Sequence, residues 1–134
     1  MKRVLFLTLS LLFLATSLFA AEGSLLLREP TVSDDNIVFV YANDLWLVER
    51  EGGEARRLTS NDGAERYPHF SPDGEMIAFT AQYDGNDDVY VVPVNGGQPK
   101  RLTYHPGADR VVGWTPDGEN ILFVSGRKGV PTME

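Results

Sequence analysis

Phe70-Ser71-Pro72-Asp73-Gly74-Glu75-Met76-Ile77-Ala78-Phe79 is the stretch that decides the fold of this chain. Its first half is a tight turn, because proline presets φ at the second turn position and glycine accepts the positive φ that follows the aspartate. Its second half is a short apolar run, which is typical of a strand covered on both faces. The stretch therefore predicts the end of one strand, a turn and a second strand.

The same pattern returns forty-four residues further along the chain, and three other blocks share this spacing. The matched pairs are Ser71–Gly74 with Thr115–Gly118, Asp44–Leu47 with Asp88–Val91, Gly52–Gly53 with Gly96–Gly97, and Arg57–Thr59 with Arg101–Thr103. An earlier copy of the turn is visible at Ser33–Ile37, where the hairpin that follows is four residues shorter. Four blocks at one offset indicate a structural repeat with the period of a propeller blade.

Each repeat is expected to form four short strands. In the middle repeat these are Tyr67–Phe70, Met76–Ala81, Val89–Val94 and Lys100–Tyr104. The second and third strands are apolar on both faces, so each must be covered by a neighbouring blade on either side. We therefore predict an all-β fold, an incomplete β-propeller with blades at about residues 25–66, 67–110 and 111–134. A ring normally takes 4–8 blades, so we expect the chain to be a fragment or the product of a truncated reading frame.

Residues 1–20 have the pattern of a secretory signal peptide. Lys2 and Arg3 precede an apolar run that ends in the small residues Ala20 and Ala21. An uncleaved membrane anchor is the alternative, but the run is shorter than the ~20 residues of a spanning helix. We expect cleavage after Ala20 or Ala21 and a periplasmic or secreted protein. No membrane contact is expected beyond the signal peptide.

The composition excludes several classes of partner and site. Removing the leader removes two of the twelve basic residues and none of the nineteen acidic ones, so the net charge falls from −7 to −9. Such a chain is repelled by phosphate backbones and by anionic membranes, which argues against nucleic acid as a partner. The chain has no cysteine, which rules out disulfides and thiolate metal sites. No cofactor is expected.

The turn-and-strand block from Phe70 to Phe79 and the block Asp87–Val92 resemble the WD40-like repeat of the TolB and tricorn propellers. The tails Gly53–Thr59 and Gly97–Thr103 fit the same family. Arg28-Glu29-Pro30 directly after the leader, and Thr103–Trp114, are similar to the first blade and the third-blade junction of tricorn-type proteases. TolB proteins have a small α/β domain before the propeller, for which Ala21–Glu29 leaves no room.

The resemblance implies a large parent protein with two propellers, a PDZ domain and a C-terminal serine-peptidase domain. Such enzymes trim short peptides, which the propellers are thought to channel or filter. The implied function is a non-catalytic module that binds or gates peptides, with the rest of the parent polypeptide as its partner. A TolB-like periplasmic scaffold that binds a protein partner is the alternative, and a glycosidase- or lactonase-like propeller enzyme is a third. No catalytic residue of the tricorn enzymes has a counterpart in this chain.

The candidate site residues are few, and each has a structural alternative. His69 and Trp114 lie on or at the end of first strands, which line the central channel of propellers, so we expect them to be channel-facing. His69 could instead pack against the channel wall, and Trp114 could be core. Trp46 and Tyr90 occupy one repeat position and are expected to be blade-to-blade core.

Two further patterns are read as structural. The loop Asp84–Asp88 is acidic, but Val89 and Asn95 stand where a calcium-binding EF-hand loop needs glycine and glutamate. His69 and Ser71 share a strand face, yet the Ser71 hydroxyl is better explained by capping its own turn. No nucleophile is found beside a base and an orienting carboxylate.

Overall fold

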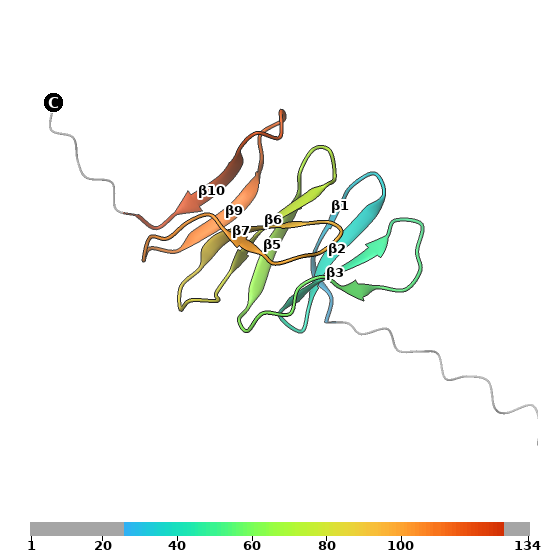
Figure 1. Ribbon diagram of the computed structural model, residues 1–134, viewed down its shortest axis with the longest axis horizontal. Coiled ribbons are helices and arrows are strands. Elements are labelled where there is room, and N and C mark those ends of the chain that lie inside the picture. Colours follow the sequence, from blue (N-terminus) through green and yellow to red (C-terminus); the bar gives the residue numbers. More distant parts are fainter. Residues whose placement is uncertain (1–25, 128–134) are drawn as a thin grey trace, which may run out of the picture.

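The computed structural model describes residues 26–127. Its strands form three antiparallel sheets that stand side by side in chain order (Figure 1). The predicted signal peptide lies outside the described residues. Within residues 26–127, no helix is long and apolar enough to cross a membrane.

The first two sheets are complete four-stranded blades, and the strands of each follow one another in space as in sequence. Blade 1 consists of β1 (Arg28–Val32), β2 (Asn36–Tyr41), β3 (Asp44–Glu49) and β4 (Arg56–Arg57). Blade 2 consists of β5 (Glu65–Phe70), β6 (Met76–Ala81), β7 (Asp88–Pro93) and β8 (Lys100–Arg101). The described part of blade 3 contains β9 (Asp109–Trp114) and β10 (Ile121–Ser125). The fold is therefore an incomplete β-propeller, as predicted.

The turn that identified the repeat forms as its sequence indicates. Gly74 and Gly118 both have φ of 73°, where a side chain would be strained. The Ser71 hydroxyl accepts a hydrogen bond from the Met76 amide at 2.9 Å and donates one to the Asp73 carboxylate. The prediction that Ser71 caps its turn is confirmed. Thr115 repeats this arrangement with Asp117 and Asn120 in blade 3.

The first strand of blade 2 begins at Glu65, two residues before the predicted start. A β-bulge causes the difference, since the β5–β6 register shifts between Arg66 and His69 and Tyr67 has φ of 53°. β1 has the same bulge, with Glu29 at φ of 51°. Arg28-Glu29-Pro30 and Arg66-Tyr67-Pro68 are therefore equivalent, at a spacing of thirty-eight residues. The spacing is shorter than forty-four residues because the first turn and hairpin of blade 1 contain fewer residues than those of blade 2.

The main core lies between blades 1 and 2. Side chains from β2 and β3 that face blade 2 pack against side chains from β6 and β7 that face back. The members are Val38, Val40, Leu45, Leu47, Leu58, Ile77, Phe79, Ala81, Tyr90 and Val92. Ala78 and Val89, on the opposite face of blade 2, pack with Val111 of blade 3. Blade 2 is thus covered on both faces, which explains why its central strands are apolar on both sides.

Trp46 and Tyr90 differ in spite of their shared repeat position. Tyr90 is 4% exposed and belongs to the core between blades 1 and 2. Trp46 is only half-buried and contacts Tyr41 edge-on at 5.7 Å between ring centroids. Successive side chains of a strand point to opposite faces, so Trp46 lies on the face of blade 1 that is turned away from blade 2. The prediction of blade-to-blade core is confirmed for Tyr90 and wrong for Trp46 among the described residues.

Candidate functional site

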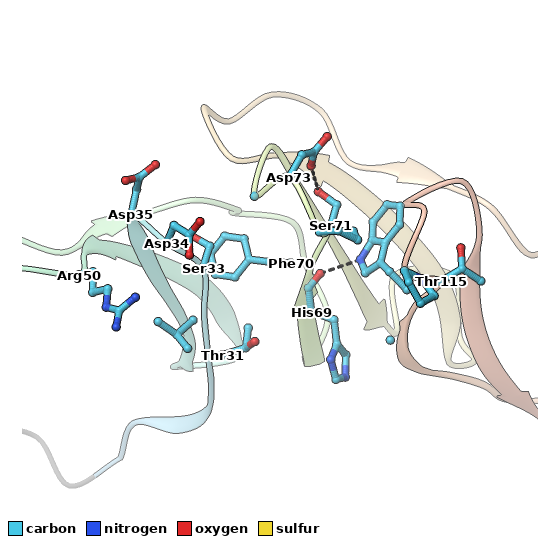
Figure 2. A pocket seen from close by; sticks show the side chains of 16 residues that line it. Thr31, Ser33, Asp34, Asp35, Arg50, His69, Phe70, Ser71, Asp73 and Thr115 are labelled. Carbon is cyan, nitrogen blue, oxygen red and sulfur yellow. Dashed lines mark hydrogen bonds between the residues drawn. The ribbon is translucent and has the colours of Figure 1, made fainter.

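A cavity of about 480 Å³ lies where the first hairpin turns of the three blades meet. Its walls come from the ends of β1, β5 and β9 and from the turns that follow each of them (Figure 2). These first strands are neighbours, because β5 packs against both β1 and β9. We call this cavity the mouth cavity. It depends on three segments about forty residues apart, so only the assembled blades create it.

The structure brings both predicted site residues, His69 and Trp114, to the wall of the mouth cavity. The Trp114 indole nitrogen donates a hydrogen bond to the His69 carbonyl oxygen at 3.0 Å, which joins β9 to β5. In Figure 2 the His69 imidazole points away from the turn that holds Ser71 and Asp73. Burial lowers the pKa of His69, which favours the neutral form of the imidazole. Whether the two residues face a channel stays a prediction.

The polar groups of the mouth cavity are mainly acidic. Asp34, Asp35 and Asp73 contribute carboxylates, and Arg50 contributes the one guanidinium of the lining. Hydrogen bonds from the Ser71 hydroxyl and the Glu75 amide hold the pKa of Asp73 below its usual range. The Asp73 carboxylate is therefore committed to its own turn. Asp34 and Asp35 are exposed and remain able to contact a cationic or hydrogen-bond-donating ligand.

His69 and Ser71 do not form a nucleophile–base pair. The Ser71 hydroxyl is bonded within its turn, to Asp73 and to the Met76 backbone, and the His69 ring turns away from it (Figure 2). Nucleophilic catalysis needs a base within hydrogen-bond reach of the hydroxyl. The mouth cavity instead provides a binding surface that is lined by Trp114, His69 and the exposed carboxylates of Asp34 and Asp35.

A second polar arrangement joins consecutive blades, and sequence reasoning did not find it. Glu65 at the start of β5 is fully buried and accepts hydrogen bonds from the Leu45 amide at 2.8 Å, from the Thr59 hydroxyl and from the Tyr83 hydroxyl. The Thr59 hydroxyl also accepts from the Leu45 amide at 2.9 Å. We call these four residues the inter-blade latch. Burial raises the pKa of Glu65 in spite of its hydrogen bonds.

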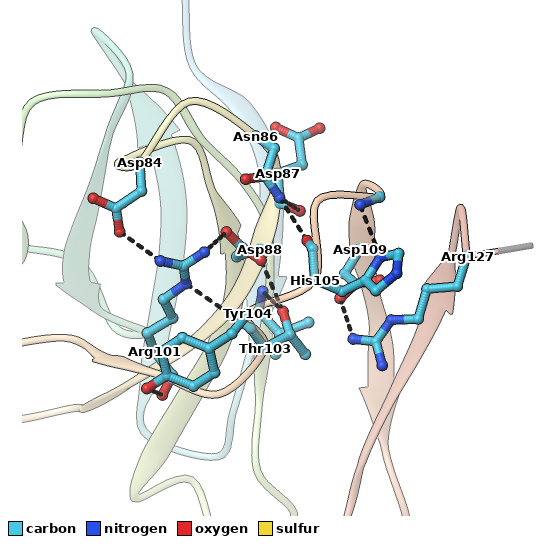
Figure 3. Close-up of polar contacts among 12 residues, drawn as sticks. Asp84, Asn86, Asp87, Asp88, Arg101, Thr103, Tyr104, His105, Asp109 and Arg127 are labelled. Carbon is cyan, nitrogen blue, oxygen red and sulfur yellow. Dashed lines mark hydrogen bonds and ion pairs between the residues drawn. The ribbon is translucent and has the colours of Figure 1, made fainter.

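The next blade repeats part of the latch, with Asp109 where Glu65 stands (Figure 3). Thr103 accepts a hydrogen bond from the Val89 amide at 3.0 Å, and Arg127 binds Asp109 at 2.8 Å. Burial of Asp109 favours its neutral form, but its polar surroundings, which include the Arg127 guanidinium at 2.8 Å, outweigh this and lower its pKa. The Arg-Leu-Thr tails singled out in the sequence thus serve to join blades.

The acidic loop after β6 is held by an arginine. Arg101 contacts Asp84 at 2.8 Å and the fully buried Asp88 at 2.6 Å, and Figure 3 shows its guanidinium between the two carboxylates. Arg57 contacts Asp44 at 2.9 Å at the equivalent place in blade 1. These carboxylates therefore have a structural role. Among residues 26–127 no group of three or more acidic or histidine side chains could hold a metal ion.

Comparison with known protein families gives a match over most of the chain. The model of the tricorn protease N-terminal beta propeller domain matches residues 24–134. A putative tricorn protease homolog 2 of Streptomyces coelicolor is 46% identical over 56 residues, which cover 41% of this chain and 5% of that protein. The tricorn protease of Thermoplasma acidophilum is 40% identical over 53 residues, covering 40% of this chain and 5% of its own length. This chain thus matches only a small part of these relatives.

Solved structures agree with this match. The crystal structure of the tricorn protease has a TM-score of 0.65 at 32% identity, over 73% of this chain and 10% of that one. TolB from Acinetobacter baumannii has a TM-score of 0.64 at 30% identity, over 77% of this chain and 27% of TolB. The family match spans the three blades and their mouth cavity. The chain belongs to the tricorn protease N-terminal β-propeller family.

Proposed function

We propose that this chain is a non-catalytic propeller module of an exported tricorn-type peptidase, and that it binds or gates peptides for a serine-protease domain. Membership of the tricorn protease N-terminal β-propeller family supports a tricorn-type peptidase as the parent protein. The mouth cavity supports the binding role, because the first strands and turns of three blades together build one hollow with a tryptophan edge.

The chemistry of the mouth cavity favours a peptide over other ligands. Trp114 contributes an aromatic ring to the cavity wall, while Asp34, Asp35 and Arg50 offer partners for amide, ammonium and carboxylate groups. Pockets of this kind, with an aromatic wall and a few placed polar groups, suit small flexible ligands. A polyanion is disfavoured by the excess of carboxylates and by the net charge of −7.

Tryptophan fluorescence tests the proposal directly. The chain has two tryptophans, and Trp46→Phe leaves Trp114 as the single reporter at the mouth cavity. We expect a saturable change in Trp114 emission when hexapeptides with free termini are added. The Asp34→Asn/Asp35→Asn double variant should bind a lysine-containing hexapeptide more weakly than the parent does. A flat titration to millimolar peptide would contradict peptide binding.

A TolB-like scaffold is the second candidate, supported by the similarity to TolB structures. In that function the propeller face would bind a folded protein partner. The same titration separates the two candidates, since a scaffold is expected to give no saturable response to short peptides.

Export is part of the proposal and rests on the pattern of residues 1–20. Expression of the full chain in a Gram-negative host should yield a periplasmic product that begins at Ala21 or Glu22. Mass spectrometry of the intact product measures this. A cytoplasmic product that retains Met1 would argue against export.

A further inference from the structure

The blade 1 side of the mouth cavity carries charged side chains of both signs. Asp34, Asp35 and Arg50 line this side, and all three are exposed. Within residues 26–127, no hydrogen bond or ion pair joins their charged groups to another residue. Two carboxylates and one guanidinium are therefore available in the same hollow.

These charges do not neutralise one another, although they lie on neighbouring turns. The Arg50 amide donates a hydrogen bond to the Asp35 carbonyl oxygen at 2.8 Å, so the two backbones are in contact. Figure 2 shows the Asp35 carboxylate and the Arg50 guanidinium pointing away from each other. Arg57 and Arg101, by contrast, each contact a carboxylate of their own blade, at 2.9 and 2.6 Å. Arg50 thus differs from the arginines that hold the blades together.

An aromatic wall adjoins the charged side of the mouth cavity. Phe70 is half-buried, and in Figure 2 its ring is directed toward the blade 1 turn that carries Asp34. Trp114 continues the wall on blade 3, where its hydrogen bond to the His69 carbonyl oxygen fixes the indole. Aromatic walls of this kind accept apolar side chains of a ligand.

We propose that the mouth cavity selects short peptides whose two termini are both free, an inference that rests on the peptide-binding function proposed above. The N-terminal ammonium of the ligand contacts Asp34 and Asp35, and its C-terminal carboxylate contacts Arg50. A guanidinium suits this role because its parallel N–H groups match the two oxygens of a carboxylate. An apolar side chain of the ligand packs on the aromatic wall.

The position of the charges limits the length of the ligand. Because the backbones of Asp35 and Arg50 are in contact, the two charged ends of the ligand must lie close together as well. An extended tripeptide spans about 10 Å, whereas an extended hexapeptide spans about 20 Å. A tripeptide can therefore engage both charged groups at once, and an extended hexapeptide engages one of them.

The test compares blocked and free forms of one tripeptide. The full chain with Trp46→Phe reports binding through Trp114 emission, and the ligand is alanyl-leucyl-alanine in its free, N-acetylated, C-amidated and doubly blocked forms. Each single block should weaken binding about three- to fivefold, as expected for the loss of one exposed ion pair. The free hexapeptide that repeats this sequence twice should bind more weakly than the free tripeptide.

Matched variants assign each terminus to its partner. Arg50→Gln should bind the free acid and the amide equally, and Asp34→Asn/Asp35→Asn should bind the free amine and the acetylated peptide equally. Glu51→Gln is the control, because Glu51 is exposed and lies outside the mouth cavity, and this variant should keep both preferences. Circular dichroism shows whether the variants keep their sheet structure. If one unfolds, the blocked ligands on the Trp46→Phe chain decide.

The outcomes separate this inference from the function on which it rests. Saturable binding that neither acetylation nor amidation weakens would overturn the selection of free termini and leave peptide binding in place. Equal affinity for the tripeptide and the hexapeptide would overturn the limit on length. A flat titration with every peptide would overturn both the inference and the proposed function.

Discussion

Glu65→Ala is expected to destabilise this chain by about 2–4 kcal/mol, because the substitution removes the acceptor at the centre of the inter-blade latch. Glu65 is fully buried and accepts three hydrogen bonds. The Leu45 amide keeps Thr59 as a second acceptor, but the hydroxyls of Thr59 and Tyr83 lose theirs. A buried donor left without an acceptor costs roughly 1–3 kcal/mol. Tyr83 is only half-buried and regains some hydration, so the lower part of the summed range applies.

Urea unfolding followed by circular dichroism measures this loss. Glu75→Ala is the matched control, because Glu75 is an exposed turn residue and its side-chain truncation should change stability by no more than about 0.5 kcal/mol. Glu65→Gln keeps the volume and one acceptor oxygen, so its effect should lie between the two. A loss below about 1 kcal/mol for Glu65→Ala, or one equal to that of Glu75→Ala, would refute the reasoning.

The latch also predicts a coupling between its members. Thr59→Val removes a hydroxyl that donates to Glu65 and also leaves Glu65 as the last of the two side-chain acceptors of the Leu45 amide, so the losses caused by the two substitutions should not add. Residues that share a hydrogen-bond network show coupling energies of about 0.5–3 kcal/mol. Strict additivity of the Thr59→Val and Glu65→Ala losses would mean that the two side chains act independently.

Four further outcomes are expected. Because the pKa of Glu65 is raised, the stability it confers is present below its unfolded pKa and is lost as pH rises through the folded pKa, and Glu65→Gln should remove this decline. The lowered pKa of Asp109 gives the opposite pH dependence, because the stability that this carboxylate confers is lost as pH falls through its folded pKa. Asp109→Asn should therefore reduce the loss of stability on acidification, as measured by urea midpoints across pH. Gly63→Ala should destabilise more than Gly85→Ala in thermal melts, since both have positive φ but only the former places a Cβ 2.6 Å from the Gln82 carbonyl oxygen. Ser71→Ala should cost about 1 kcal/mol in urea unfolding, because the Met76 amide loses its side-chain acceptor.

The strands could be predicted from the sequence because their signals are local. Met76–Ala81 was placed correctly to the residue, since a Pro-Asp-Gly turn precedes it and a polar loop follows it. The bulge in β5 was missed, although Arg66-Tyr67-Pro68 repeats Arg28-Glu29-Pro30. That match falls at a different spacing from the other blocks, and the left-handed φ of Tyr67 has no glycine to signal it.

The candidate site was predicted only in part. His69 and Trp114 were found from their places on first strands, and the structure puts both at the mouth cavity. Their hydrogen bond joins residues 45 apart in the sequence, so no local pattern could indicate it. The inter-blade latch could not be predicted from local patterns either, since its hydrogen bond between Leu45 and Glu65 joins two different sheets. Trp46 shows the converse, because its repeat position predicts a buried ring but the side chain is only half-buried among residues 26–127.

The sequence by itself determined the forty-four-residue repeat, the order of strands in each blade and the family of the chain. Turn residues and apolar runs act over a few positions, so they are readable without knowledge of the rest of the molecule. The tertiary structure alone decided which faces meet, which carboxylate is buried at each latch, and that three turns enclose one cavity. These features depend on how neighbouring sheets pack and twist against each other, and that packing joins residues that the sequence keeps far apart.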